Sequence, residues 1–157
     1  MANAANTGTQ NPAMPHAGAS ASQGGASMLL RVVTPSRQLL SEPVEELQVP
    51  GKAGYLGILP GHAPMLSELR VGELTYRQGR NLHRLLITGG FLEVLPEQVT
   101  ILAEAAERPE EIDLARAQTA RDRAEKRLRS ADPEVDLNRA TVALERALIR
   151  IQLAGKS

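Results

Sequence analysis

The chain has 157 residues, and its 18 basic and 18 acidic side chains cancel at neutral pH, which leaves no overall attraction to nucleic acid or to anionic lipid. It contains no cysteine, which excludes disulfides and thiolate metal sites. Its length fits one ordinary domain or two small ones, and its aromatic content of 2% argues against a surface on which bases stack.

Residues 1–27 contain no Asp, Glu, Lys or Arg. Ala, Gly, Ser, Asn and Pro dominate this segment, so it has little apolar surface to bury and we predict a disordered tail. It has neither the arginines of a transit peptide nor the basic start and apolar core of a secretory signal; a targeting role is the alternative. No apolar run in the sequence approaches the roughly 18 residues of a membrane span, so we expect membrane association only through a partner.

Short strands are predicted in the next part of the chain. The segments 28–34 (MLLRVVT) and 44–50 (VEELQVP) are separated by turn residues, and further strands are predicted within residues 72–104. Breaks between these strands are expected at 78–81, 89–90 and 96–98. Gly89 and Gly90 stand between apolar runs and predict a hairpin turn, because glycine accepts the positive φ that such turns need. Short strands with a turn about every ten residues indicate an antiparallel sandwich or a small barrel.

From residue 110 the apolar period becomes helical. Steps of three and four residues place one set of apolar side chains on one face of a first helix, namely Leu114, Ala117, Ala120, Ala124 and Leu128. A second set predicts a second helix, namely Leu137, Ala140, Leu144, Ala147, Leu148 and Ile151. Asp132 is predicted to cap the second helix, with Pro133 at its first position, so that the two helices form an antiparallel hairpin. Because alanine buries little apolar area, we expect this hairpin to be the less stable part of the chain, able to detach.

No arrangement of residues in the sequence resembles a catalytic site. The terminal GKS lacks the earlier glycine of a phosphate loop. The three histidines, His16, His62 and His83, lack the spacing of metal ligands. We therefore predict no catalytic residue, no metal and no required cofactor.

The charged side chains of the predicted helices mostly have an opposite charge three or four residues away, as solvated helix faces usually do. Four arginines lack such a partner, namely Arg123, Arg127, Arg146 and Arg150. They form one like-charged pair on each helix. In a closed hairpin both pairs can face one anion, and guanidinium groups suit phosphate because their planar fork donates two parallel hydrogen bonds. Surface charge, or contact with an acidic patch of a partner, is the alternative.

Three motifs occur in a fixed order before the helical hairpin. They are GYLGILPGHAPML at 54–66, GGFLEV at 89–94 and VTILAE at 99–104. In this order and spacing they resemble the epsilon subunit of the bacterial F-type ATP synthase, over residues 28–153.

The resemblance implies a domain organisation and a role. It implies a β-sandwich of about ten antiparallel strands at 28–107 and an antiparallel α-helical hairpin at 108–157, after the tail at 1–27. It also implies a non-catalytic subunit of the central rotor of the proton-transporting ATP synthase, which couples the catalytic head to the c-ring. The partners would be the gamma subunit, the c-ring, and the alpha and beta subunits.

The 54–66 loop is then predicted to be a docking surface for the gamma subunit and the c-ring. Its docking residues are Gly57, Ile58, Leu59, Pro60, Gly61, His62 and Met65. Glycines let another backbone approach closely, and Ile58, Leu59 and Met65 are expected to offer apolar area. We expect His62 to order the loop through a hydrogen bond rather than to do chemistry.

The resemblance also implies a ligand, because some bacterial members bind ATP in the folded hairpin without hydrolysing it, through the motif I/L-D-x-x-R-A. Residues 112–117 (IDLARA) match this motif in full. The matching positions predict an ATP site formed by Glu107, Ile112, Asp113, Arg116, Ala117, Arg123, Arg146 and Arg150. Three of the four unpartnered arginines belong to this set, whereas Arg127 does not and is predicted to be a surface or partner contact. ATP would then be a regulatory ligand.

The implied mechanism is a two-state hairpin. ATP is expected to stabilise the docked state. In the extended state Arg139, Arg146 and Arg150 are predicted to meet acidic residues of beta and to block rotation in the ATP-hydrolysing direction. A purely structural coupling subunit without an ATP site is one alternative, and a free-standing nucleotide-binding protein or enzyme is another. We expect a peripheral location on the cytoplasmic face of the bacterial plasma membrane.

Overall fold

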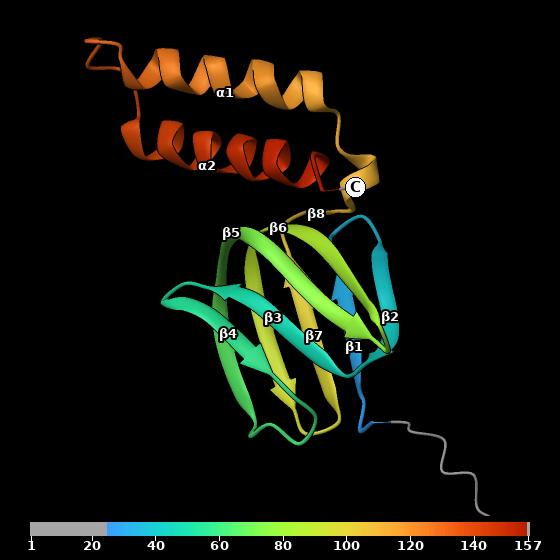
Figure 1. The fold of residues 1–157 in the computed structure, drawn as a ribbon. Coiled ribbons are helices and arrows are strands. Elements are labelled where there is room, and N and C mark those ends of the chain that lie inside the picture. The colour runs from blue at the N-terminus through green and yellow to red at the C-terminus, as the bar shows by residue number, and fades with distance from the viewer. Residues whose placement is uncertain (1–24, 157) are drawn as a thin grey trace, which may run out of the picture.

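The computed structural model describes residues 25–156, so the predicted disordered tail lies almost wholly outside the described residues. The chain folds into a β-sandwich with two helices stacked at one end (Figure 1), which confirms the predicted fold class. The strands are β1 (Met28–Val33), β2 (Gln38–Val44), β3 (Glu46–Gly51), β4 (Gly54–Ile58), β5 (Met65–Gln78), β6 (Asn81–Leu95), β7 (Gln98–Ala103) and β8 (Ala106–Glu107). The helical elements are the 3-10 turn η1 (Pro109–Glu111), α1 (Leu114–Leu128) and α2 (Leu137–Ala154).

The strands hydrogen-bond in one continuous order, β2-β1-β7-β6-β5-β3-β4, with β8 beside β6. The pairs are antiparallel except for β1 and β7, which run parallel. β5 and β6, of 14 and 15 residues, pair with each other and bend together, so that each contributes to both layers (Figure 1). Eight strands are described, and counting the two bent strands once in each layer gives the ten that were expected.

The bend in β6 lies at Gly89 and Gly90, where a hairpin turn was predicted, and that prediction was wrong. Both glycines have positive φ, 113° and 119°, but β6 stays paired with β5 on both sides of them. A Cβ on Gly90 would lie 2.0 Å from the carbonyl oxygen of Leu102. The core-facing positions change from odd residues such as Ile87 to even residues such as Leu92 across the bend. Glycine therefore serves here to fold one strand over the core.

Both helices begin with the same sequence pattern, Asp-Leu-x-Arg-Ala. Asp113 caps α1 and Asp136 caps α2, and each carboxylate accepts the backbone N–H three residues on at 2.9 Å. Asp132, the predicted cap of the second helix, only caps a turn by accepting the N–H of Glu134, so that prediction was wrong. A turn at residues 133–134 follows Asp132, and α2 begins only after Asp136.

Alanines form the contact between the two helices. Ala117 and Ala124 of α1 and Ala140 and Ala147 of α2 are buried, which allows a close approach of the helix backbones. Three leucines of the predicted apolar faces are exposed instead, namely Leu114, Leu137 and Leu148. The buried surface of each helix is centred on its alanines, and these three leucines lie at the edge of that surface. No helix within residues 25–156 has the length and apolar character to cross a membrane.

Candidate functional site

A pocket of about 600 Å³ lies where the hairpin meets the sandwich. Side chains from β8, η1, α1 and α2 form its walls, so the walls are complete only when the hairpin is docked. It is lined by Glu107, Glu111, Asp113, Arg116, Ala117, Thr119, Ala120, Arg123 and Arg150. Six of the eight residues predicted to bind ATP are among them.

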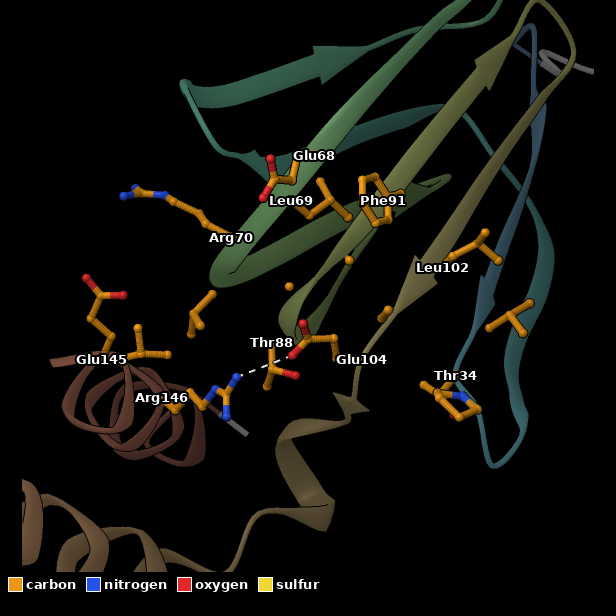
Figure 2. A pocket seen from close by; sticks show the side chains of 17 residues that line it. Thr34, Glu68, Leu69, Arg70, Thr88, Phe91, Leu102, Glu104, Glu145 and Arg146 are labelled. Carbon is orange, nitrogen blue, oxygen red and sulfur yellow. Dashed lines mark hydrogen bonds and ion pairs between the residues drawn. The ribbon is translucent and has the colours of Figure 1, made fainter. Parts of the chain in front are cut away.

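The other two predicted residues lie elsewhere. Ile112 precedes the cap of α1 and does not line the pocket. Arg146 reaches toward Glu104, just past the end of β7, and donates from Nη2 to Oε2 at 3.3 Å (Figure 2). Arg146 and Glu104 stand at one end of a more apolar groove of about 680 Å³, which Phe91 and Leu102 also line.

The carboxylates of the 600 Å³ pocket are all engaged. Glu107 accepts from Arg150, whose Nε lies 3.1 and 3.2 Å from the two carboxylate oxygens and whose Nη2 also donates to Oε1. Asp113 caps α1. Glu111 accepts the backbone N–H of Arg108. Each carboxylate that lines this pocket thus has a hydrogen-bond partner among the described residues.

Glu111 attaches the linker between sandwich and hairpin, which contains η1, to the sandwich. Arg37, between β1 and β2, donates from Nη2 to both of its carboxylate oxygens at 3.0 Å. The backbone N–H of Arg108, and then the Arg37 guanidinium, hold the pKa of Glu111 below its ordinary value. η1 is thus tied to the sandwich through Glu111.

Two guanidinium groups in the pocket have no carboxylate partner within the described part of the chain. They belong to Arg116 and Arg123 of α1, for which no ion pair is found among residues 25–156. With Arg150 across the pocket, they provide three planar donors for a multiply charged anion. Of the four arginines singled out by charge pattern, the structure brings Arg123 and Arg150 together in this pocket and places Arg127 and Arg146 outside it.

Arg139 lies in the first turn of α2 and does not line the pocket. Arg146 and Arg150 follow it by seven and eleven residues, so the three arginines share one side of α2. In the docked hairpin Arg146 and Arg150 already contact acids of the sandwich end.

The predicted docking loop lies at the opposite end of the sandwich from the helices (Figure 1). The N–H of Gly61 donates to the carbonyl of Pro96 in the β6–β7 turn at 2.8 Å. His62 Nδ1 lies 2.8 Å from the carbonyl oxygen of Ala63 and donates to it, as expected of a residue that orders the loop. Of the remaining predicted loop residues, Gly57, Leu59 and Gly61 are exposed and Pro60 is half-buried.

Two side chains of this loop were expected to offer apolar area, and the structure buries one of them fully and the other in part. Ile58 is completely buried in the sandwich core, and Met65 packs against that core. Leu59 stays exposed, and Leu66, which sequence reasoning missed, is 78% exposed. Strand alternation after the inward-facing Met65 would have revealed Leu66.

The chain matches two family models. The beta-sandwich domain of the ATP synthase Delta/Epsilon chain matches residues 27–109, and the long alpha-helix domain of the same chain matches residues 110–155. The ATP synthase epsilon chain of Syntrophobacter fumaroxidans is 50% identical over 128 residues, which cover 82% of this chain and 96% of that one. The epsilon chain of Koribacter versatilis is 56% identical over 103 residues, which cover 66% and 72%.

Solved structures share the fold. A chain in the mitochondrial ATP synthase of Euglena gracilis, determined as an OSCP/F1/c-ring assembly, superposes with a TM-score of 0.73 at 23% identity, over 99% of this chain and 91% of that one. A chain in the central stalk and c-ring of the Tetrahymena thermophila enzyme gives 0.52 at 18% identity, over 84% and 96%. Because one family model matches the sandwich and the other matches the hairpin, this chain belongs to the ATP synthase delta/epsilon chain family, and it is similar in sequence to bacterial epsilon chains of that family.

Proposed function

We propose that this chain is the non-catalytic epsilon subunit of the central rotor of a proton-transporting ATP synthase, and that its hairpin is a brake on ATP hydrolysis which bound ATP holds in the docked position. Family membership supports the rotor role. The brake is supported by one observation above all: the 600 Å³ pocket takes its walls from both sides of the junction between hairpin and sandwich.

The shared walls explain why a ligand would favour docking. Glu107 belongs to the sandwich end, Arg123 to α1 and Arg150 to α2. A ligand that touches all three finds them together only in the docked state. Because a ligand shifts a conformational equilibrium by its differential affinity for the two states, such a ligand stabilises docking.

The donors and acceptors in the pocket fit a nucleoside triphosphate. Arg116, Arg123 and Arg150 can share the phosphate oxygens, since guanidinium forks match phosphate geometry. Glu107 can accept from hydroxyl or amino groups of the nucleoside. In the proposed role, ATP is a regulatory ligand that is bound and not cleaved.

In the extended state the arginine side of α2 becomes available to a partner. Arg139, Arg146 and Arg150 would then face acidic residues of the beta subunit and oppose rotation. The far end of the sandwich, with Leu59 and Leu66 exposed, would meet the gamma subunit and the c-ring. We propose a peripheral location on the cytoplasmic face of the bacterial plasma membrane.

Calorimetric titration of the full chain with ATP tests the ligand. Arg123→Ala should weaken binding about tenfold or more, because a charged hydrogen bond contributes about 1.5–3 kcal/mol. Arg127→Ala is the matched control, one turn further along α1 and outside the pocket, and should change the affinity less than about twofold. Absence of binding at several times the cellular ATP concentration would leave a purely structural coupling subunit.

Deletion of residues 110–157 tests the brake. In the reconstituted complex, assembly should stay intact and ATP hydrolysis should rise, because the segment that blocks rotation is gone. Hydrolysis equal to that of the complete enzyme would contradict an inhibitory hairpin, and loss of assembly would assign the hairpin a structural role instead.

A further inference from the structure

Few apolar side chains hold the hairpin on the sandwich. Within residues 25–156, six buried apolar residues lie outside the sandwich core, and four of them are the alanines between the helices. The other two are Leu86 of β6 and Leu153 in the last turn of α2, both completely buried. Leu86 stands between the core residues Leu85 and Ile87, so strand alternation points it away from the core, to the side on which α2 packs. The buried apolar part of the contact between hairpin and sandwich therefore lies between β6 and the last turn of α2.

A cation just past the end of α2 reaches the sandwich at the same place. Lys156 Nζ lies 2.7 Å from Oε2 of Glu73, which is on β5 opposite Leu86 of β6. The Glu73 side chain is only 14% exposed, the lowest value for any carboxylate in an ion pair among residues 25–156. A shielded pair loses less of its attraction to water and salt than an exposed one.

Glu73 has a second cation that belongs to the sandwich. Arg84 Nε on β6 lies 2.9 Å from its Oε1, as a close ionic contact rather than an aligned hydrogen bond. A shielded carboxylate without any partner is strongly destabilising. Because Arg84 remains when the hairpin leaves, Glu73 keeps a counter-charge in both states.

The other two ion pairs between hairpin and sandwich lack this property. Glu104 pairs with Arg146, and Glu107 with Arg150. In the part of the chain that the structure describes, neither carboxylate has a further cation. Undocking removes the only cation that residues 25–156 pair with each of these two carboxylates, whereas Glu73 keeps Arg84 as its counter-charge.

We propose that Lys156 and Glu73 form a latch that sets how firmly the hairpin stays docked, separately from the nucleotide pocket. Neither residue lines that pocket. Arg84 acts as a positioning residue that holds the Glu73 carboxylate in place for the return of Lys156. The inference rests on the mobile hairpin of the proposed function, but it does not require ATP to bind.

A thiol reporter at position 88 measures undocking. Thr88 is 5% exposed and lies two residues beyond Leu86 on the same side of β6. The chain has no cysteine of its own, so Thr88→Cys provides a single reactive thiol. Its labelling rate rises with the fraction of molecules in which the hairpin has opened, even when that fraction is small.

In the Thr88→Cys background without ATP, Lys156→Gln should speed labelling about two- to fivefold, the range expected of one ion pair. Lys156→Arg should restore the slow rate, because it restores the charge. Glu73→Gln should act like Lys156→Gln, and the double substitution should be no faster than the faster single one. Lys126→Gln, which removes an exposed lysine of α1, is the matched control.

The latch is overturned if Lys156→Gln labels at the Lys126→Gln rate, or if the two latch substitutions act additively. A thiol introduced by Val99→Cys in the sandwich core must stay unreactive in each variant, which separates undocking from unfolding. ATP tests the proposed function independently, because it should slow labelling at position 88 with or without Lys156. Slowing by ATP without a Lys156 effect removes only the latch; a Lys156 effect without slowing by ATP removes only the ATP site.

Discussion

Arg150 and Glu107 face each other across the junction between α2 and β8, with Arg150 Nε within 3.2 Å of both carboxylate oxygens. Their side chains are 27% and 28% exposed, so water shields the pair only in part. Among the described residues this is the ion pair that both closes the hairpin and lines the 600 Å³ pocket. The contact between hairpin and sandwich and the proposed ligand site therefore share these two side chains.

Arg150→Ala should loosen the hairpin even without a ligand. It leaves Glu107 half-buried and without a cation, which should reduce the free energy of docking by about 1 kcal/mol. Hydrogen exchange of the α2 amides should speed up about fivefold as a result. Arg129→Ala, which breaks an exposed pair with Glu125 inside α1, should change exchange in α2 little. Equal effects of the two substitutions would show that the Arg150 pair does not hold the hairpin.

Hydrogen exchange should divide the chain into two parts. Amides in residues 110–155 should exchange faster than those in 28–104, because alanine contacts bury little area while the sandwich core contains many buried Leu, Ile and Val side chains. Exchange of the native chain, resolved by peptide, measures this directly. Equal protection of α1 and the central strands would rule out a hairpin of lower local stability.

Gly90→Ala should destabilise the sandwich severely. The added Cβ would meet the Leu102 carbonyl oxygen at 2.0 Å, at a residue whose φ is 119°. We expect a loss of about 3 kcal/mol or more in the free energy of unfolding, or failure to fold. Gly57→Ala is the control, because its Cβ would meet nothing within 4 Å. Urea unfolding of both variants decides the matter, and near-native stability of Gly90→Ala would refute the strand-bend assignment.

Acid should weaken the anchor of the linker through Glu111. The N–H of Arg108 and the Arg37 guanidinium hold its folded pKa below the ordinary 4.5. The carboxylate therefore contributes its full stabilisation above pH 4.5 and loses it as the pH falls through the lowered folded value. Unfolding free energies measured between about pH 6 and pH 3 should fall more steeply in the native chain than in Glu111→Gln. Parallel curves would mean that this carboxylate is not coupled to folding.

Local patterns in the sequence were enough to predict a sandwich followed by a helical hairpin. The change from short strands to a helical period near residue 110 predicted the sandwich and the hairpin, because each element must turn one face away from water. The Asp-Leu-x-Arg-Ala pattern at Asp113 is a local capping signal, and the match to the nucleotide motif at the same place came from resemblance. Most residues named from that motif do line one pocket.

Local sequence predicted the wrong role for residues whose role depends on how distant parts of the chain pack together. Gly90 has the conformational freedom of a turn residue, and only the pairing partners of β6 make it a bend. Ile58 reads as an apolar residue of an exposed loop, but it ends a strand that faces the core. Asp132 can cap a helix as well as Asp136 can, and the geometry of the reversal selects the second.

Long-range charge pairing could not be predicted at all. Arg146 and Arg150 have no opposite charge three or four residues away in the sequence. Their partners lie 42 and 43 residues away, and Lys156 meets Glu73 across 83 residues. Periodicity specifies which face of an element is buried, since that follows from the helical and strand repeat of each segment alone. The pairing of carboxylates with cations depends on how β5 and β6 bend and on where α2 packs against them. Both are properties of the packed chain as a whole.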